Sequence, residues 1–133
     1  MTDFDFLGHD GLVDALLMEV ADLLQTFLFH RCPGTIDLLG LPLSPACLAA
    51  LEQRLGDGEI AVVLRVSGES QIRETSFPGV WWTRHADETG RVVALLIEVA
   101  DAPEILRAGK ADMENSLRRL GEVTNFAQAR SAR

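Results

Sequence analysis

The sequence predicts an α+β fold in which a four-stranded antiparallel β-meander is flanked by N-terminal and C-terminal helices. Apolar residues recur at helical spacing in residues 10–55, whereas short alternating runs separated by turn residues fill residues 59–99. The turns between these runs are short, and parallel strands need long crossovers, so the runs are expected to pair antiparallel. A chain of 133 residues has the length of one domain, which is expected to span residues 1–133.

Two helices are expected before the sheet. The first runs from Leu12 to Phe29, where apolar residues follow helical spacing and Asp10 can cap the start. Acidic residues interrupt this stretch, which excludes a membrane span; they are Asp14, Glu19 and Asp22. A connector with a little extended structure follows. The second helix opens at Ser44-Pro45 and ends at Gly56.

Four runs are expected to form the strands of the meander. They are Glu59–Val66, Gln71–Phe77, Val80–His85 and Arg91–Val99. Turn signals separate them at Ser67-Gly68, at Pro78-Gly79 and from Asp87 to Gly90. C-terminal helices are expected over about residues 102–121, with Pro103 in the first turn and a break or bend at Gly109.

Two adjacent tryptophans, Trp81 and Trp82, lie in the third run, and a strand sends neighbouring side chains to opposite faces. If Pro78-Gly79 is a two-residue turn, one face carries Trp82 together with two arginines and is expected to face water. Trp81 is therefore predicted to point inward and Trp82 outward. The predicted partner-binding patch consists of Trp82, Phe77, Val80, Arg73 and Arg84. Binding of a partner, self-association into a homodimer and packing within the chain remain open for this patch.

The net charge of −8 is concentrated in the first half of the chain. Residues 1–60 carry ten acidic and two basic side chains, whereas residues 61–133 carry ten of each. No basic patch is present, so nucleic acid is not an expected partner, and the acidic half either attracts a cationic partner or serves solubility. Two cysteines are too few for a disulfide framework, and no secretory signal or membrane span is evident, so a cytoplasmic protein is expected.

Evidence for catalysis or metal binding is sparse. His30, Cys32 and Cys47 form the closest set of histidine and cysteine residues, but their spacing is not that of a zinc motif. We expect neither metal nor cofactor, and a metal or iron–sulfur carrier using these three residues remains an alternative. A small enzyme of unknown type is a further alternative, for which the side chains are Glu74, Arg73 and His85. Because no nucleophile elbow or phosphate-binding loop occurs, we predict no catalytic residues.

Four stretches carry a family resemblance. They are "IDLLGLPLS" at Ile36–Ser44, "LGDGEIAVVL" at Leu55–Leu64, "IRETSFPGVWWTRH" at Ile72–His85 and "IEVADAPEIL" at Ile97–Leu106. In this order and spacing they resemble the C-terminal conserved region of the HupH/HyaF family of hydrogenase expression proteins.

This resemblance implies a non-catalytic, chaperone-like accessory role in the maturation of a nickel–iron uptake hydrogenase. It implies as partners the iron–sulfur small subunit of the hydrogenase, which carries a twin-arginine export signal, and other maturation accessory proteins. The action would precede export. No catalytic residues are established for the family, so none is carried over to this sequence, and many members are longer, with a further N-terminal segment.

Overall fold

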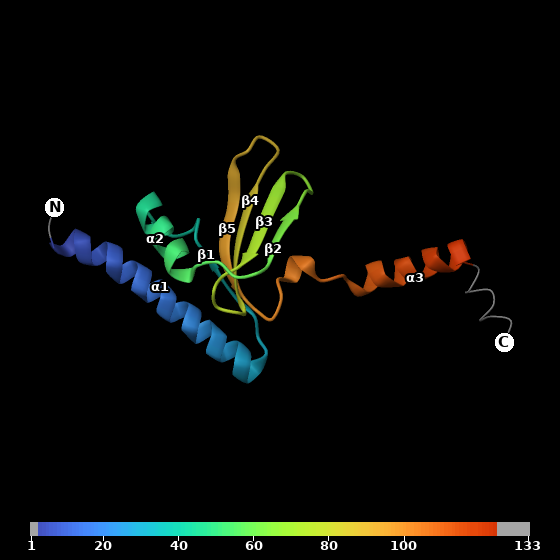
Figure 1. Ribbon diagram of the computed structural model, residues 1–133, viewed down its shortest axis with the longest axis horizontal. Helices are drawn as coiled ribbons and strands as arrows, with labels where there is room; N and C mark the ends of the chain where they lie inside the picture. Colours follow the sequence, from blue (N-terminus) through green and yellow to red (C-terminus); the bar gives the residue numbers. More distant parts are fainter. Residues whose placement is uncertain (1–2, 125–133) are drawn as a thin grey trace. The chain divides into compact units, whose positions relative to one another are not determined.

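The computed structural model describes the backbone of residues 3–124 and the side chains of residues 11–124 (Figure 1). The elements are α1 (Asp3–His30), β1 (Gly34–Asp37), α2 (Pro45–Leu55), β2 (Ala61–Leu64), β3 (Glu69–Glu74), β4 (Val80–Ala86), β5 (Val92–Val99), the 3-10 helix η1 (Glu104–Leu106) and α3 (Lys110–Thr124). The chain divides into two compact units, with the boundary between Pro103 and Glu104. The first unit holds α1, α2 and the sheet, and the second holds η1 and α3.

Helix α1 begins earlier than the sequence predicts. It starts at Asp3, so Asp10 lies inside the helix and the expected cap is wrong. Its buried side chains recur at helical spacing; they are Val13, Leu16, Val20 and Phe27. The helix closes at Arg31, which adopts a left-handed φ of 56° and donates its N–H to the carbonyl oxygen of Phe27 (2.8 Å). In the described part of the chain, no helix combines the length and apolarity that crossing a bilayer requires.

Helix α2 forms where the sequence predicts it. Ser44 caps the helix, because its Oγ accepts a hydrogen bond from the N–H of Cys47 (3.0 Å). Pro45 stands in the first turn, where its missing N–H is not needed. Gly56, at a φ of 69°, donates its N–H to the carbonyl oxygen of Glu52 (3.0 Å) and ends the helix.

The sheet contains five strands within residues 3–124, in the order β1-β5-β4-β3-β2, and every neighbouring pair is antiparallel. The predicted antiparallel meander is present as β2 to β5, but the predicted number of four strands is wrong. The additional strand, β1, pairs with β5 at the edge opposite to β2, with Ile36 opposite Ile97. It lies in the segment that the sequence presents as a connector, and its four residues are too few to show an alternating pattern.

The connection between β3 and β4 is longer than predicted. Arg73 lies opposite Trp82 and Glu74 opposite Trp81, so residues 75–79 form the connection in place of a two-residue turn. Thr75 holds this loop, because its Oγ1 donates to the carbonyl oxygen of Val80 (2.9 Å) and accepts from the N–H of Phe77 (3.2 Å). The register differs from the predicted one by an even number of residues, so the two faces of each strand are unchanged.

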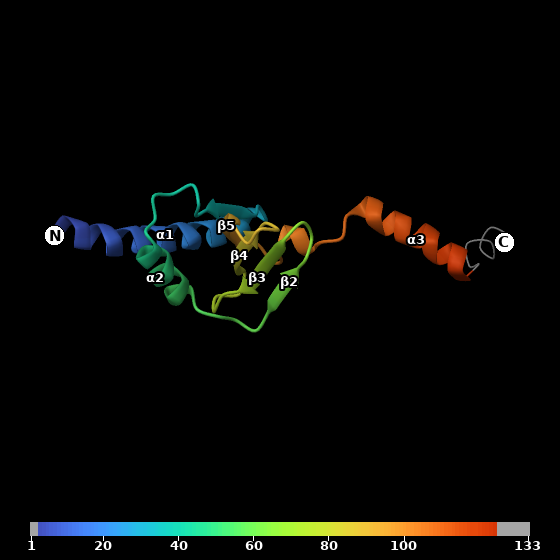
Figure 2. The same cartoon turned by 90° about the horizontal axis from the view of Figure 1, so that it is seen from above.

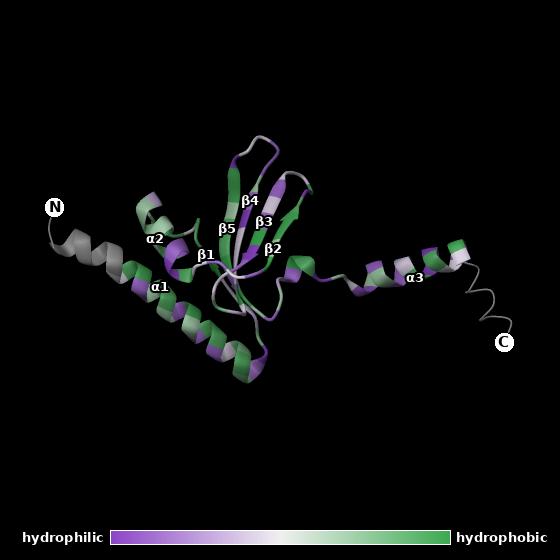
Figure 3. Ribbon diagram, in the orientation of Figure 1, coloured by the Kyte–Doolittle hydropathy of each residue, from purple (hydrophilic) through white to green (hydrophobic). Residues whose placement is uncertain are grey.

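The core lies between the two N-terminal helices and the sheet face that carries Trp82. It is formed by side chains of α1, α2, β1, β4 and β5, including Leu51, Ile36, Trp82, Ile97 and Val99. Figure 3 shows the apolar residues that run along α1 and β5 toward this core. The expected outward position of Trp82 is therefore wrong, since its exposed fraction is 5% and that of Val80 is 0%.

The physical reason lies in where the helices pack. In the views of Figures 1 and 2, α1 and α2 stand on the β1 side of the first unit, whereas β2 lies apart from them. The helices therefore cover the face of β4 and β5 that carries Trp82. Arg73, on the same face of β3, lies at the edge of the covered area. Trp81 is buried (5% exposed), as predicted, but it lies on the face opposite to the helices and not on the face that they cover. Its indole N–H donates to the carbonyl oxygen of Ala100 (3.1 Å).

Candidate functional site

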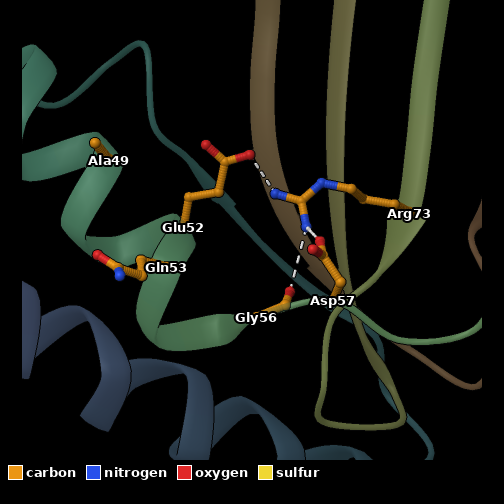
Figure 4. A pocket seen from close by; sticks show the side chains of 6 residues that line it. All are labelled: Ala49, Glu52, Gln53, Gly56, Asp57 and Arg73. Atoms are coloured by element: carbon orange, nitrogen blue, oxygen red, sulfur yellow. Dashed lines mark hydrogen bonds and ion pairs between the residues drawn. The ribbon is translucent and has the colours of Figure 1, made fainter.

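Arg73 is the central residue of an open pocket between α2 and β3 (Figure 4). Its guanidinium binds the carboxylates of Glu52 and Asp57 and donates a further hydrogen bond to the carbonyl oxygen of Gly56 (3.2 Å). The pocket has a volume of about 410 Å³ and is lined by Ala49, Glu52, Gln53, Gly56, Asp57 and Arg73. We call this site the Arg73 pocket.

Local structure brings these groups together. Arg73 lies opposite Trp82 in the β3–β4 ladder, so its side chain leaves the sheet on the face covered by the helices. Its Cζ atom lies 5.6 Å from the centroid of the Trp82 ring, within the range of a cation–π contact. Helix α2 ends beside this position, which turns Glu52 and Asp57 toward the guanidinium, as Figure 4 shows.

The Arg73 pocket carries more negative than positive charge. Two carboxylates surround one guanidinium, so the formal charge of the cluster is negative. The carboxylate side chains are 47% (Glu52) and 83% (Asp57) exposed, whereas the side chain of Arg73 is only 24% exposed. The negative groups therefore face the solvent while the cation lies beneath them. This arrangement can accept a cationic group from outside.

The structure separates the residues of the predicted partner-binding patch. Trp82 and Val80 lie in the core, and Phe77 is half-exposed on the loop between β3 and β4. Arg84 is partly buried on β4, and Arg73 reaches the Arg73 pocket. Nothing in the structure tests binding of a partner by these side chains, and that role stays a prediction. Glu52 and Asp57 were not predictable as site residues, because no local sequence pattern indicates that a residue of α2 and a loop residue contact a side chain of β3.

The opposite face of the sheet carries a polar pair. The Oγ of Ser70 lies 2.6 Å from the Nδ1 of His85, and Ser70 is buried. Such a hydroxyl–imidazole pair can transfer a proton, but a catalytic base is normally oriented by a third group. Within residues 11–124, no carboxylate hydrogen-bonds to His85. Its acidic neighbour is Asp87, whose pKa is lowered mainly by a hydrogen bond from the hydroxyl of Thr89 and also by the N–H of Arg91.

The structure does not assemble the residues of the enzyme alternative. Arg73 points to the helix-covered face, whereas Glu74 and His85 belong to the other face. Glu74 is four residues from Ser70, the partner of His85, which corresponds to about 13 Å along a strand. The three side chains therefore do not share a site.

The structure also does not assemble the three residues of the metal-carrier alternative. Cys47 lies on the buried side of α2, and Cys32 is exposed after the end of α1. Throughout the part of the chain whose side chains the structure describes, no group of three or more histidine, cysteine, aspartate or glutamate residues could hold a metal ion. His30, Cys32 and Cys47 are therefore not brought together into a site.

Comparison with known proteins identifies relatives of the chain. Residues 13–127 match the family model described as HupH hydrogenase expression protein, C-terminal conserved region. The chain is 30% identical over 118 residues to the hydrogenase expression/formation protein HoxQ of Azotobacter vinelandii, covering 86% of this chain and 42% of that protein. It is 33% identical over 117 residues to the hydrogenase-1 operon protein HyaF of Escherichia coli, covering 88% of this chain and 41% of that protein.

A solved structure agrees with these relationships. The hydrogenase expression protein HupH from Thiobacillus denitrificans is 40% identical and superposes with a TM-score of 0.79, covering 89% of this chain and 97% of that one. The chain spans about two fifths of the length of the curated relatives that it matches. These matches confirm the resemblance found in the sequence, and the chain belongs to the family of HupH hydrogenase expression proteins, in which it corresponds to the C-terminal conserved region.

Proposed function

We propose that this chain is a non-catalytic accessory protein in the maturation of a nickel–iron uptake hydrogenase. It acts in the cytoplasm, beside other maturation accessory proteins, on the iron–sulfur small subunit before export. The names of the relatives, which are hydrogenase expression/formation proteins and a hydrogenase-1 operon protein, support a role in maturation. The small subunit as the partner follows from the family resemblance.

The observation that carries the proposal is the Arg73 pocket. Its exposed carboxylates, Glu52 and Asp57, present negative charge at the surface of an acidic half of the chain. A twin-arginine export signal supplies the complementary charge, and a guanidinium can pair with a carboxylate through two parallel hydrogen bonds. The proposed contact is therefore between the Arg73 pocket and the cationic part of the signal.

The test measures association of the purified chain with the small-subunit precursor by biolayer interferometry. We expect the association rate to fall as salt rises, since exposed charges are screened within about 8–10 Å near physiological ionic strength. Asp57→Asn should slow association, and replacing the two signal arginines by glutamine should do the same. Glu19→Gln is the matched control, because it removes an exposed acidic charge from α1 outside the Arg73 pocket.

The outcomes test separately whether the small subunit is the partner and whether the Arg73 pocket is the contact. If the precursor does not bind at any salt concentration, the small subunit is not the partner. If it binds at a rate that is independent of salt and of Asp57→Asn, the acidic charge serves solubility and the contact lies elsewhere.

A further inference from the structure

Strand β2 is an edge of the sheet, and Figures 1 and 2 show it at the end of the strand order. The N–H of Glu74 donates to the carbonyl oxygen of Ile60 (2.8 Å). This bond determines which residues of β2 direct their backbone groups toward β3. Because hydrogen-bonded pairs alternate in an antiparallel ladder, the backbone groups of Val62 and Leu64 face β3. Those of Ala61 and Val63 therefore point away from the sheet.

The run from Ile60 to Leu64 at this edge lacks two of the features that usually prevent strands from pairing with other chains, although the strand is short. Natural edges carry charges, prolines or bulges, or are covered by another segment. The run from Ile60 to Leu64 contains no charge and no proline, and Figure 3 shows β2 as an apolar strand. Ile60 is 45% exposed and Val63 is 51% exposed. The edge thus offers free backbone groups beside accessible apolar side chains.

The residues on either side of this run carry opposite charges. Glu59 precedes it and Arg65 follows it, and both are exposed. Neither side chain forms an ion pair with any residue that the structure describes. If a second copy of β2 pairs antiparallel about Val62, Glu59 of each copy lies opposite Arg65 of the other. The segment from Glu59 to Arg65 is therefore complementary to itself.

The same register also provides hydrogen-bond partners for the outward N–H and C=O groups of β2. Ala61 lies opposite Val63 of the second copy, and both residues have outward N–H and C=O groups, so each pair exchanges both hydrogen bonds. A register shifted by one residue would place outward groups against groups that already face β3. A register shifted by two residues would keep the hydrogen-bond phase but separate Glu59 from Arg65.

We propose that two copies of this chain pair through β2 about a twofold axis at Val62, so that the two sheets become one continuous sheet. The interface is isologous, and it closes because each copy uses its single β2 edge. This inference goes beyond the proposed function, since it needs no hydrogenase subunit. The strand is short, so the dimer is expected to dissociate on dilution.

Sedimentation velocity of the purified chain over a concentration series tests the proposal. Glu59→Arg alone, or Arg65→Glu alone, places like charges opposite each other in both pairs, and we expect the dimer dissociation constant to rise about tenfold or more. An equimolar mixture of the two variants restores opposite charges at both pairs and should form a heterodimer. The double variant Glu59→Arg/Arg65→Glu should recover the homodimer.

Two further variants separate the interface from folding. Val63→Pro removes an outward N–H that does not bond to β3, so the monomer should keep its circular dichroism spectrum while the dimer is lost. Leu117→Gln, on α3, should leave the dimer unchanged. A chain that stays monomeric at every concentration overturns the proposal. So does a dimer that neither Glu59→Arg nor Val63→Pro weakens, or variants that do not associate when mixed.

Discussion

Arg73 and Trp82 lie opposite each other in the β3–β4 ladder, and the guanidinium covers the indole ring at 5.6 Å from its centroid. This contact joins the core to the Arg73 pocket. One side of the guanidinium meets the buried tryptophan, while its N–H groups bind the carboxylates of Glu52 and Asp57. The residue therefore has both a structural and an electrostatic role.

Replacing Arg73 by alanine should lower the free energy of unfolding by about 1–2 kcal/mol. The substitution removes the cation–π contact together with the two partly exposed ion pairs to Glu52 and Asp57. Urea unfolding followed by tryptophan fluorescence measures the change. The control is Arg54→Ala, which removes only an exposed ion pair to Asp14 (3.5 Å) and should change the free energy of unfolding by less than about 0.5 kcal/mol. Equal effects of the two substitutions would contradict this account.

Both tryptophans should be essential for stability, because both are buried. Trp81→Ala and Trp82→Ala are each expected to cost about 3–5 kcal/mol of the free energy of unfolding, as large core truncations do. Circular dichroism during thermal unfolding measures the loss. Phe77→Ala provides the comparison, since Phe77 is 49% exposed and its removal should have a much smaller effect. A benign Trp82→Ala variant would place Trp82 outside the core.

Thr83 in β4 and Thr75 in the connection between β3 and β4 should respond in opposite ways to replacement by valine. The hydroxyl of Thr83 is buried and has no hydrogen-bond partner among the described residues, so Thr83→Val should raise the free energy of unfolding by about 1 kcal/mol. Thr75 is also buried, but its hydroxyl bonds to Val80 and Phe77, so Thr75→Val should lower it by about 1–3 kcal/mol. Denaturant melts compare the pair, and a loss for Thr83→Val would show that its hydroxyl has a partner.

The turn between β4 and β5 should weaken in acid. The hydrogen bond from Thr89 is the main cause that lowers the pKa of Asp87 from its ordinary value of 3.8, and the N–H of Arg91 contributes as well. A lowered folded pKa means that the carboxylate stabilises the turn at pH values above 3.8, and that this contribution is lost as the pH falls through the folded value.

The expected result is a difference in stability between the natural chain and Asp87→Asn that is constant near neutral pH and shrinks in acid. Thermal unfolding of both proteins over a pH series measures it, and the other carboxyl groups cancel in the comparison. A difference that grows toward low pH would have the wrong sign for a lowered pKa.

The sequence predicts the elements whose signals are local. Helix α2 has its cap at Ser44 and its end at Gly56, and the meander has turn residues between alternating runs, so both could be placed from neighbouring residues alone. The strand β1, which the sequence did not reveal, forms only by pairing with β5, and β5 lies near the C-terminal end of the first unit in the sequence. Its pairing is therefore not visible in any short window of sequence.

The orientation of Trp82 and the composition of the Arg73 pocket could not be predicted from the sequence for the same reason. Alternation places Trp81 and Trp82 on opposite faces, but it does not say which face the helices cover or whether both faces are covered. Glu52 and Asp57 meet Arg73 only because α2 ends beside β3. Charge on a strand is thus a poor guide to exposure when another element supplies the opposite charge.

The pairing of β1 with β5 also determines the order in which the first unit can form during synthesis. Gly34 lies opposite Val99, so β1 has no partner until the ribosome has made nearly the whole unit. The hairpins from β2 to β5 join neighbours in sequence and can close early, whereas pairing across a long loop is slow. Helix α1 can pack against α2 as soon as both have been made, but the part of its apolar side that contacts β5 stays uncovered in the nascent chain until β5 has been synthesised.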